Sequence, residues 1–239
     1  MAILTNASDT HLYCAADNFV ASTSPFSVSV WVNTVWNGNS RVTLCGLYNG
    51  TYNGSVTTTT AMQIGTSTGS GELSVWTYGG TQLVDSATGV MTPYNNTWAM
   101  ITYTYDGTTH SIYNGPTLVG SSTSAPVSGT FTQVYINGYP PTGNANETSA
   151  SYFDSYSYFN RTLSQPEIQC MYTAAGFRDG IVYGELANYS FGGGAQGATV
   201  TELNDLTGNG NNLTYTGTGS AITYTYTNSY PDINLRPPL

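Results

Sequence analysis

The sequence predicts an all-β protein, a double-sheet sandwich or jelly roll with one short helix. Apolar residues alternate with polar residues along many short segments, which is the pattern of strands with one buried face. Turn-forming residues separate these segments at short intervals. A helical pattern occurs between residues 164 and 176. Many short strands with frequent turns are typical of sandwiches and jelly rolls.

The clearest strand is the segment FSVSVWVNT, in which the even-numbered apolar residues from Phe26 to Val32 share one face. The odd-numbered residues Ser27, Ser29, Trp31 and Asn33 share the other face. Further strands are predicted at residues 42–47, 62–64, 72–78, 98–105, 110–113, 131–136 and 152–159.

Asp106-Gly107 stands between two predicted strands and favours a tight hairpin turn with positive φ at both residues. Two longer stretches, 48–60 and 139–151, are rich in Gly and Asn and are predicted as surface loops.

The helix prediction rests on the segment LSQPEIQCMYTAAG. Ser164 suits the N-cap, and Glu167, three residues later, can complete a capping box. The apolar residues that follow recur at a helical period, and Gly176 suits the position after the last turn.

Composition excludes several function classes. At 239 residues, one domain is the better expectation. Charged residues make up 7% of the chain, the net charge is −9 and there is no lysine, so nucleic-acid and membrane-surface binding are not expected. The start of the chain lacks the basic and apolar pattern of a secretory signal, and no run is apolar enough for a spanning helix. The basic residues are Arg41, Arg161, Arg178 and Arg236.

Three blocks of this sequence resemble a known superfamily, in the order in which that superfamily carries them. The blocks are FSVSVWVNT, WAMITYTYDGTTHSIYNG and YFDSYSYFNRTLSQPEIQCMYTAAG. Together they resemble the laminin-G-like, concanavalin A-like jelly-roll superfamily over residues 10–176. The resemblance implies a concanavalin A-like double-sheet jelly-roll sandwich. It leaves function open, because this sandwich hosts lectins, glycosidases, adhesion modules and virion parts.

Residues 186–217 look like the segment that usually opens such a domain, yet they follow the helix. We therefore predict a jelly-roll sandwich over 1–180 and a strand segment over 181–217 that completes the sandwich. The completion is either within the chain, by circular permutation, or in a neighbouring subunit, by a swap. Residues 218–239, which end in a Pro-rich stretch, are predicted to form an extended C-terminal arm.

Enzymatic activity is not expected. Glycoside hydrolysis needs two carboxylates that flank one bond, and the Glu-x-Asp-x-Glu pattern of the glucanase branch is absent from this sequence. With His11 and His110 as the two histidines and no Gly-x-Ser-x-Gly motif, a nucleophilic triad has little support. His110 is predicted to be an exposed structural residue.

No metal and no other cofactor is predicted. The sequence from Asp205 through Thr207 and Asn209 to Gly210 matches the first half of an oxygen-ligand calcium loop, but position twelve is Thr216 and not Glu. Members of the superfamily often hold calcium at a sandwich edge, so calcium binding at Asp205 stays open. The cysteines are too widely spaced for a disulfide framework or a metal knuckle; they are Cys14, Cys45 and Cys170.

Aromatic residues are the candidate binding residues. Trp31, Trp76 and Trp98 fall in strand patterns and are predicted to pack within or between the sheets. Trp36 lies in a polar stretch outside the matched blocks. With three tyrosines on other polar loops it could form a platform that stacks on sugars or anchors a protein interface. The four candidates are Trp36, Tyr48, Tyr52 and Tyr94.

The sequence favours a non-enzymatic structural protein of a virion, most plausibly a phage capsid decoration or cement protein or a tail-associated module. A β-rich chain without lysine has few charges to guard its sheet edges, and partners or copies of itself can cover such edges. The expected partners are a major capsid or tail protein and further copies of the chain. The expected location is a virion assembled in the host cytoplasm and exposed outside the cell. The alternative is a carbohydrate-binding, lectin-like module for attachment to a host or a glycan surface.

Overall fold

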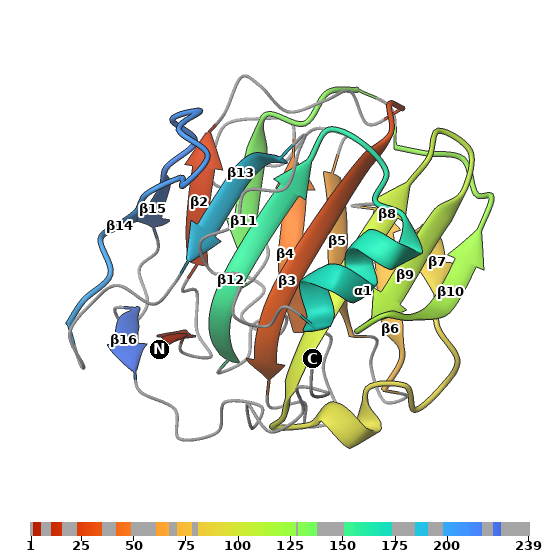
Figure 1. Ribbon diagram of the computed structural model, residues 1–239, viewed down its shortest axis with the longest axis horizontal. Coiled ribbons are helices and arrows are strands. Elements are labelled where there is room, and N and C mark those ends of the chain that lie inside the picture. The colour runs from red at the N-terminus through yellow and green to blue at the C-terminus, as the bar shows by residue number, and fades with distance from the viewer. Residues whose placement is uncertain are drawn as a thin grey trace.

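A computed structural model describes most of the β body. The described residues are 2–5, 11–15, 23–34, 42–48, 61–66, 71–77, 81–127, 129–137, 151–173, 185–190, 198–216 and 222–225. They form two antiparallel sheets that pack face to face, with one α-helix on the outside (Figure 1). In the described residues no helix is long and apolar enough to cross a membrane.

The first sheet has eight strands. Along it lie, in order, β10 (Thr117–Ser122), β9 (His110–Asn114), β8 (Trp98–Tyr105), β3 (Phe26–Thr34), β12 (Ser151–Phe159), β1 (Ala2–Thr5) and β16 (Thr223–Thr225). The eighth strand, β13 (Glu185–Ser190), pairs with the half of β12 that β1 leaves open.

The second sheet also has eight strands. Its order is β14 (Glu202–Leu203), β15 (Leu213–Thr216), β2 (His11–Ala15), β11 (Gln133–Ile136), β4 (Val42–Tyr48), β5 (Ala61–Thr66), β6 (Leu73–Thr77) and β7 (Gln82–Asp85). A 3-10 turn, η1 (Thr92–Tyr94), lies between β7 and β8.

The main core fills the space between the sheets. The even-numbered residues of β3, from Phe26 to Val32, are at most 1% exposed and belong to this core, as the alternation predicted. The ring of Phe26 stacks on Tyr158 and meets Phe131 edge-on. Burial of so much aromatic and branched apolar surface is the main stabilising term of the fold.

Helix α1 (Gln165–Thr173) covers part of the outer face of the first sheet (Figure 1). A second, smaller core of Met100, Phe159, Leu163 and Ile168 lies under it. Trp31 faces outward here, and its ring stacks on Tyr172 of the helix at 5.7 Å.

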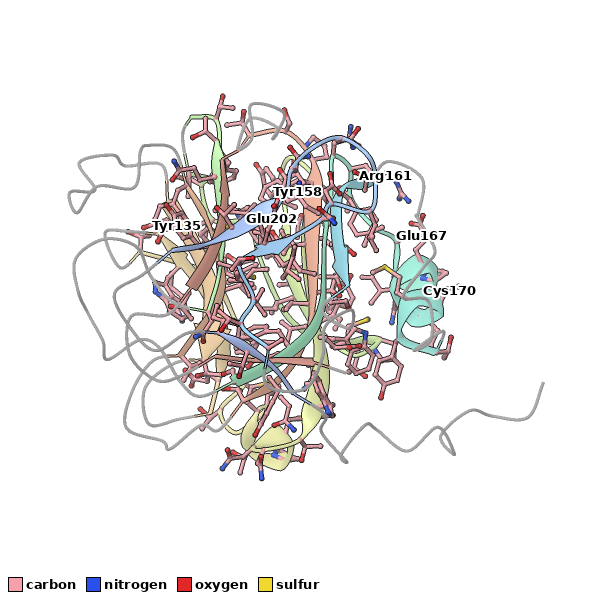
Figure 2. All side chains as sticks on the ribbon, turned by 90° about the vertical axis from the view of Figure 1, so that its left-hand side faces the viewer. Tyr135, Tyr158, Arg161, Glu167, Cys170 and Glu202 are labelled. Atoms are coloured by element: carbon pink, nitrogen blue, oxygen red, sulfur yellow. The ribbon has the colours of Figure 1, made fainter. Side chains whose placement is uncertain are left out.

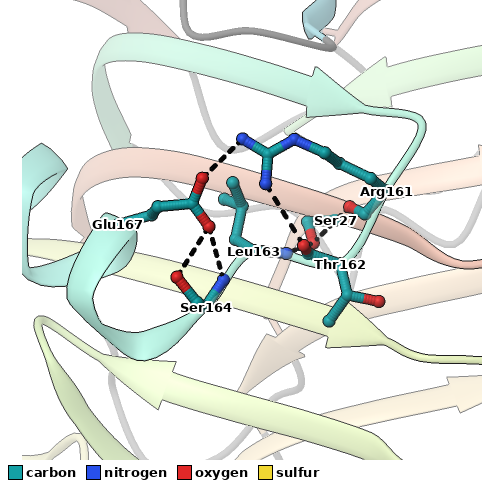
Figure 3. A network of polar contacts seen from close by, with 6 residues as sticks. All are labelled: Ser27, Arg161, Thr162, Leu163, Ser164 and Glu167. Atoms are coloured by element: carbon teal, nitrogen blue, oxygen red, sulfur yellow. Dashed lines mark hydrogen bonds and ion pairs between the residues drawn. The ribbon is translucent and has the colours of Figure 1, made fainter.

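The start of α1 confirms one of the two hydrogen bonds of the predicted capping box, the one from the Ser164 amide to the Glu167 carboxylate (Figure 3). The Glu167 carboxylate accepts hydrogen bonds from the Ser164 amide and hydroxyl at 2.8 and 2.7 Å, and an ion pair from Arg161 at 2.7 Å. The Ser164 hydroxyl therefore donates to Glu167. Ser27 of β3 links this turn to the sheet, because its hydroxyl accepts from the Leu163 amide and donates to the Arg161 carbonyl.

In the described residues the double-sheet sandwich with one short α-helix is confirmed, and each strand predicted from residue 26 to 159 has a counterpart. The hairpin after β8 differs in detail. Tyr105 pairs with His110, so the loop has four residues, and positive φ occurs at Gly107 but not at Asp106. The Asp106 carboxylate instead accepts hydrogen bonds from the amides of Thr108 and Thr109.

Strands also form after the helix. β13 pairs with β12, β15 pairs with β2, and β16 pairs with β1, all within the same chain. Part of the segment predicted as an arm thus contributes a short strand, while residues 226–239 lie outside the described part. The domain boundaries themselves stay a prediction.

Candidate functional site

The outer face of the second sheet is the face that helix α1 does not cover. Val134, Leu47 and Val75 belong to the main core, so the residues that alternate with them face outward. Tyr135 pairs with Gly46, and two strands further along Trp76 pairs with Gln82. Figure 2 shows Tyr135 on the side of the sandwich opposite the helix that carries Glu167 and Cys170.

The middle of this face is closed by aromatic rings. Tyr48 meets Tyr135 edge-on at 4.8 Å, and the Tyr135 hydroxyl donates to the Gln133 side chain at 2.7 Å. A Cβ atom at Gly46 would come within 3.0 Å of the Tyr48 ring, so glycine makes room for this ring. Tyr48 and Tyr135 are 3% and 1% exposed. These residues therefore stabilise the face and leave little of it open to a ligand.

The open part lies at the edge of the same face, on β6 and β7. Ser74 and Trp76 lie on one face of β6, and Glu72, just before the strand, continues this face. On β7, Asp85 pairs with Ser74 and Gln82 pairs with Trp76. We call these five residues the β6–β7 cluster. Gln82 is exposed and both carboxylates are half-buried, whereas Ser74 and Trp76 are buried.

Hydrogen bonds hold the two carboxylates of the β6–β7 cluster. The Ser74 hydroxyl donates to Asp85, and the Thr88 hydroxyl donates to Glu72 at 2.8 Å. Burial is the main cause that raises the pKa of Asp85, and the negative charge of Glu72 raises this pKa further against the hydrogen bonds from Ser74 and Gln82. The two carboxylates thus lie on the same face and influence each other's charge.

Carboxylates and a side-chain amide on one face can accept from and donate to the hydroxyl groups of a polyol. In the β6–β7 cluster, Gln82 is exposed and Glu72 and Asp85 are half-buried, which makes the cluster the candidate binding site. Ser74 and Trp76 are buried and pack within the cluster.

The four aromatic residues predicted as a platform are placed as follows. Tyr48 is not a loop residue, because it ends β4 and its ring is buried against Tyr135; this expectation is wrong. Tyr94 lies in η1, half-buried against the main core. Trp36 and Tyr52 lie outside the described residues.

Tyr48 and Tyr94 lie at opposite ends of the second sheet. The Met91 amide, at the start of η1, donates to the Gly71 carbonyl. Gly71 lies just before β6, and the first residue of β6, Leu73, pairs with Thr66. Thr66 pairs with Val42, the first residue of β4, whereas Tyr48 is the last. The two tyrosines therefore do not share one platform.

Asp205 is engaged by donors of its own loop. Its carboxylate accepts from the Thr207 amide and hydroxyl and from the Asn211 amide. This is the hydrogen bonding of a turn, with Gly208 and Gly210 at positive φ. In the part of the chain that the structure describes, no three His, Cys, Asp or Glu residues come together as metal ligands.

His110 is buried, at 1% exposure, so the prediction that it is exposed is wrong. It points into the sandwich because it shares one face of β9 with Ile112, which belongs to the main core. Of the three tryptophans predicted to pack, Trp76 and Trp98 are 5% and 6% exposed, and Trp31 packs under the helix.

Sequence reasoning missed Ser74, Gln82 and Asp85 as site residues. The alternation within the predicted strand 72–78 could have placed Glu72, Ser74 and Trp76 on one face. β7 has only four residues and two adjacent buried ones, Leu83 and Val84, so it shows no alternation. Its pairing with β6 could not be read from the pattern.

The comparisons with known proteins agree with the fold. A family model described as the concanavalin A-like lectin/glucanases superfamily matches residues 6–169. The search of curated proteins found no match. The CBM40 domain of the Ruminococcus gnavus IT-sialidase, solved with alpha2,3 sialyllactose, is 11% identical with a TM-score of 0.52; the match covers 71% of this chain and 96% of that domain.

Two toxin binding domains are also similar in fold. The Botulinum neurotoxin serotype D binding domain is 15% identical with a TM-score of 0.54, over 74% of this chain and 43% of that one. The binding domain of Paraclostridial Mosquitocidal Protein 1 is 15% identical with a TM-score of 0.53, over 73% and 43%. The chain thus spans less than half of these toxin chains.

Proposed function

Because the chain belongs to the concanavalin A-like lectin/glucanase superfamily, we propose that it is a non-catalytic, lectin-like module that binds carbohydrate through the β6–β7 cluster. The observation that carries this proposal is that the pairing of β6 with β7 leaves Gln82 exposed and Glu72 and Asp85 half-buried on one face. These three side chains supply several hydrogen-bonding atoms to a ligand. The similarity in fold to the CBM40 domain, 96% of which is covered by the match, supports a lectin-like role.

The charge of the site points to neutral sugars. Glu72 and Asp85 lie in a chain of net charge −9 that has four basic residues in all. A sugar that carries a carboxylate would be repelled at this site, whereas hydroxyl groups can donate to both acids. The preferred ligand is therefore a glycan without sialic acid.

Hydrolysis is the function that this site supports less well. A glycosidase needs one acid that stays protonated and a second that attacks or activates water. Burial and the charge of Glu72 raise the pKa of Asp85 against the hydrogen bonds from Ser74 and Gln82, which is the direction that a general acid needs. The sequence lacks the Glu-x-Asp-x-Glu pattern of the glucanase branch, however, so we expect binding without bond cleavage.

A glycan array tests the proposal. The full chain should bind neutral glycans, and Asp85→Asn and Gln82→Ala should each weaken that binding about tenfold, because each removes hydrogen bonds to the sugar. Gln169→Ala, an exposed glutamine on helix α1, serves as the matched control and should bind like the wild type. Binding that survives both site variants, or release of sugar products, would contradict the proposal.

A structural role in a virion is the second candidate. The chain has 7% charged residues and no lysine, which suits a protein whose surfaces are covered in an assembly. Attachment of a particle to a glycan surface is compatible with the first proposal. Sedimentation of the purified chain with capsid shells or tails tests this role, and a chain that stays in the supernatant with every virion component would count against it.

A further inference from the structure

The edge strands of the two sheets differ in how they are protected. Charged residues at an edge discourage pairing with another strand. Among the described strands, β7 carries Asp85, β14 carries Glu202 and β13 carries Glu185. β16 has no charge, but Thr223 forms a bridge to Thr199 on the side away from β1.

β10 is the edge strand in the described part that has neither a charge nor a cover. Its six residues, TLVGSS, pair with β9 on one side, and no described strand pairs with the other side. Leu118, in this strand, is 46% exposed. The strand has a bulge after Leu118, yet the residues from Gly120 to Ser122 stay in regular register with β9.

β10 is held firmly enough to act as a template. A Cβ atom at Gly120 would lie 2.1 Å from the Asp85 carbonyl, so the inner face of β10 packs directly on β7. Val119 packs against the main core. At the end of the strand, the His110 ring bonds the Ser124 carbonyl at 3.0 Å. The outer edge of β10 is thus presented in a fixed position.

The charge along β10 indicates which partner fits it. β10, its neighbour β9 and the residues after β10 up to Val127 contain no Asp, Glu, Lys or Arg, whereas the chain as a whole carries a net charge of −9. Asp85 lies on β7, which packs on the inner face of β10 and not at its open edge. Two copies of the chain repel each other over most of their surface and can approach where charge is absent. A strand as neutral as β10 is the matching partner, and a second copy supplies one.

We propose that two copies of this chain associate through their β10 strands, paired antiparallel across a twofold axis. An antiparallel pair of identical strands is symmetric. Each backbone hydrogen bond that the first copy donates to the second is therefore matched by the same hydrogen bond from the second copy to the first. The pairing joins the two first sheets into one and removes part of Leu118 from water. This inference goes beyond the proposed carbohydrate binding and stands without it.

Analytical ultracentrifugation of the full chain tests the inference. The wild type should sediment with twice the monomer mass, and Ser121→Lys should halve that mass, because it places a charge at an exposed position of the edge. Thr201→Lys adds the same charge at an exposed position on the other side of the sandwich and should stay dimeric. Leu118→Glu is the second edge variant, should Ser121→Lys fail to fold.

Amide hydrogen exchange locates the contact. The amides of β10 should exchange more slowly in the wild type than in Ser121→Lys, and those of β14 should not differ. A wild type that stays monomeric up to the highest soluble concentration would overturn the inference, and so would a dimer that both edge variants leave intact. Glycan binding by the monomeric variant would separate this result from the test of the proposed function.

Discussion

His110 is the buried titratable residue whose surroundings fix one protonation state. Its Nε2 atom lies 3.0 Å from the Ser124 carbonyl, which can only accept, so Nε2 carries the proton. Its Nδ1 atom then accepts from the Tyr103 hydroxyl at 2.6 Å, and the Tyr105 ring stacks on it at 4.5 Å. Burial lowers the pKa of His110, and the Ser124 carbonyl and the Asp106 charge offset this only in part.

Acid should therefore weaken the fold through His110. A histidine whose pKa is lowered in the folded state contributes its full stability above the unfolded pKa of about 6.5, and this stability falls as the pH drops below that value. Thermal unfolding measured from pH 7.5 to pH 5 should show a falling midpoint for the wild type and a flatter one for His110→Gln. Equal slopes for the two proteins would refute this account of His110.

At the level of elements, the start of helix α1 depends on the Glu167 carboxylate. This group accepts from Ser164 and pairs with Arg161, and the hydrogen bond from Arg161 is the main cause that lowers the pKa of Glu167 to about 2. The ionised form thus joins the helix to the turn that leaves β12.

Glu167→Ala should lower the free energy of unfolding by about 1 kcal/mol at pH 7. Because the pKa of Glu167 is lower in the folded state, its contribution is present above about pH 4.5 and is lost as the pH falls toward about 2. Urea unfolding at both ends of this range should show the two proteins converge at low pH. Gln169→Ala on the same helix is the control and should change little; a loss that persists at low pH would contradict the electrostatic explanation.

The elements that could be predicted are those whose pattern is local. β3 alternates over nine residues and β8 is rich in aromatic and branched apolar residues, and both were predicted with the bounds that the structure shows. α1 combines a cap with a helical period and was predicted within three residues at either end. β7 and β10 were not predicted, because neither strand shows a periodic pattern. β7 has four residues, of which two adjacent ones are buried, and β10 is bulged and half-exposed. Both are fixed by contact with each other through Gly120.

At the scale of the whole molecule, the two outer faces of the sandwich differ. Helix α1 covers part of one (Figure 1). The other carries the Tyr48–Tyr135 pair and the β6–β7 cluster. The superfamily could be recognised from three blocks of sequence. The residues proposed to bind could not, because Ser74 and Asp85 come together only when β6 pairs with the unpredicted β7. The fold alone does not place a site, so the site has to be argued from such pairings.

The central claim is that sugar binds at Gln82 and Asp85, the cross-strand partners of the buried Trp76 and Ser74, and an NMR titration tests it most directly. The full chain, with its indole nitrogens labelled, is titrated with a neutral glycan that it binds on the array. The account predicts that the Trp76 indole signal and the Gln82 side-chain amide shift with the same affinity, while the signals of Trp31 and Trp98 stay in place and the glycan stays intact. Shifts confined to other tryptophans, or cleavage of the glycan during the titration, would contradict it.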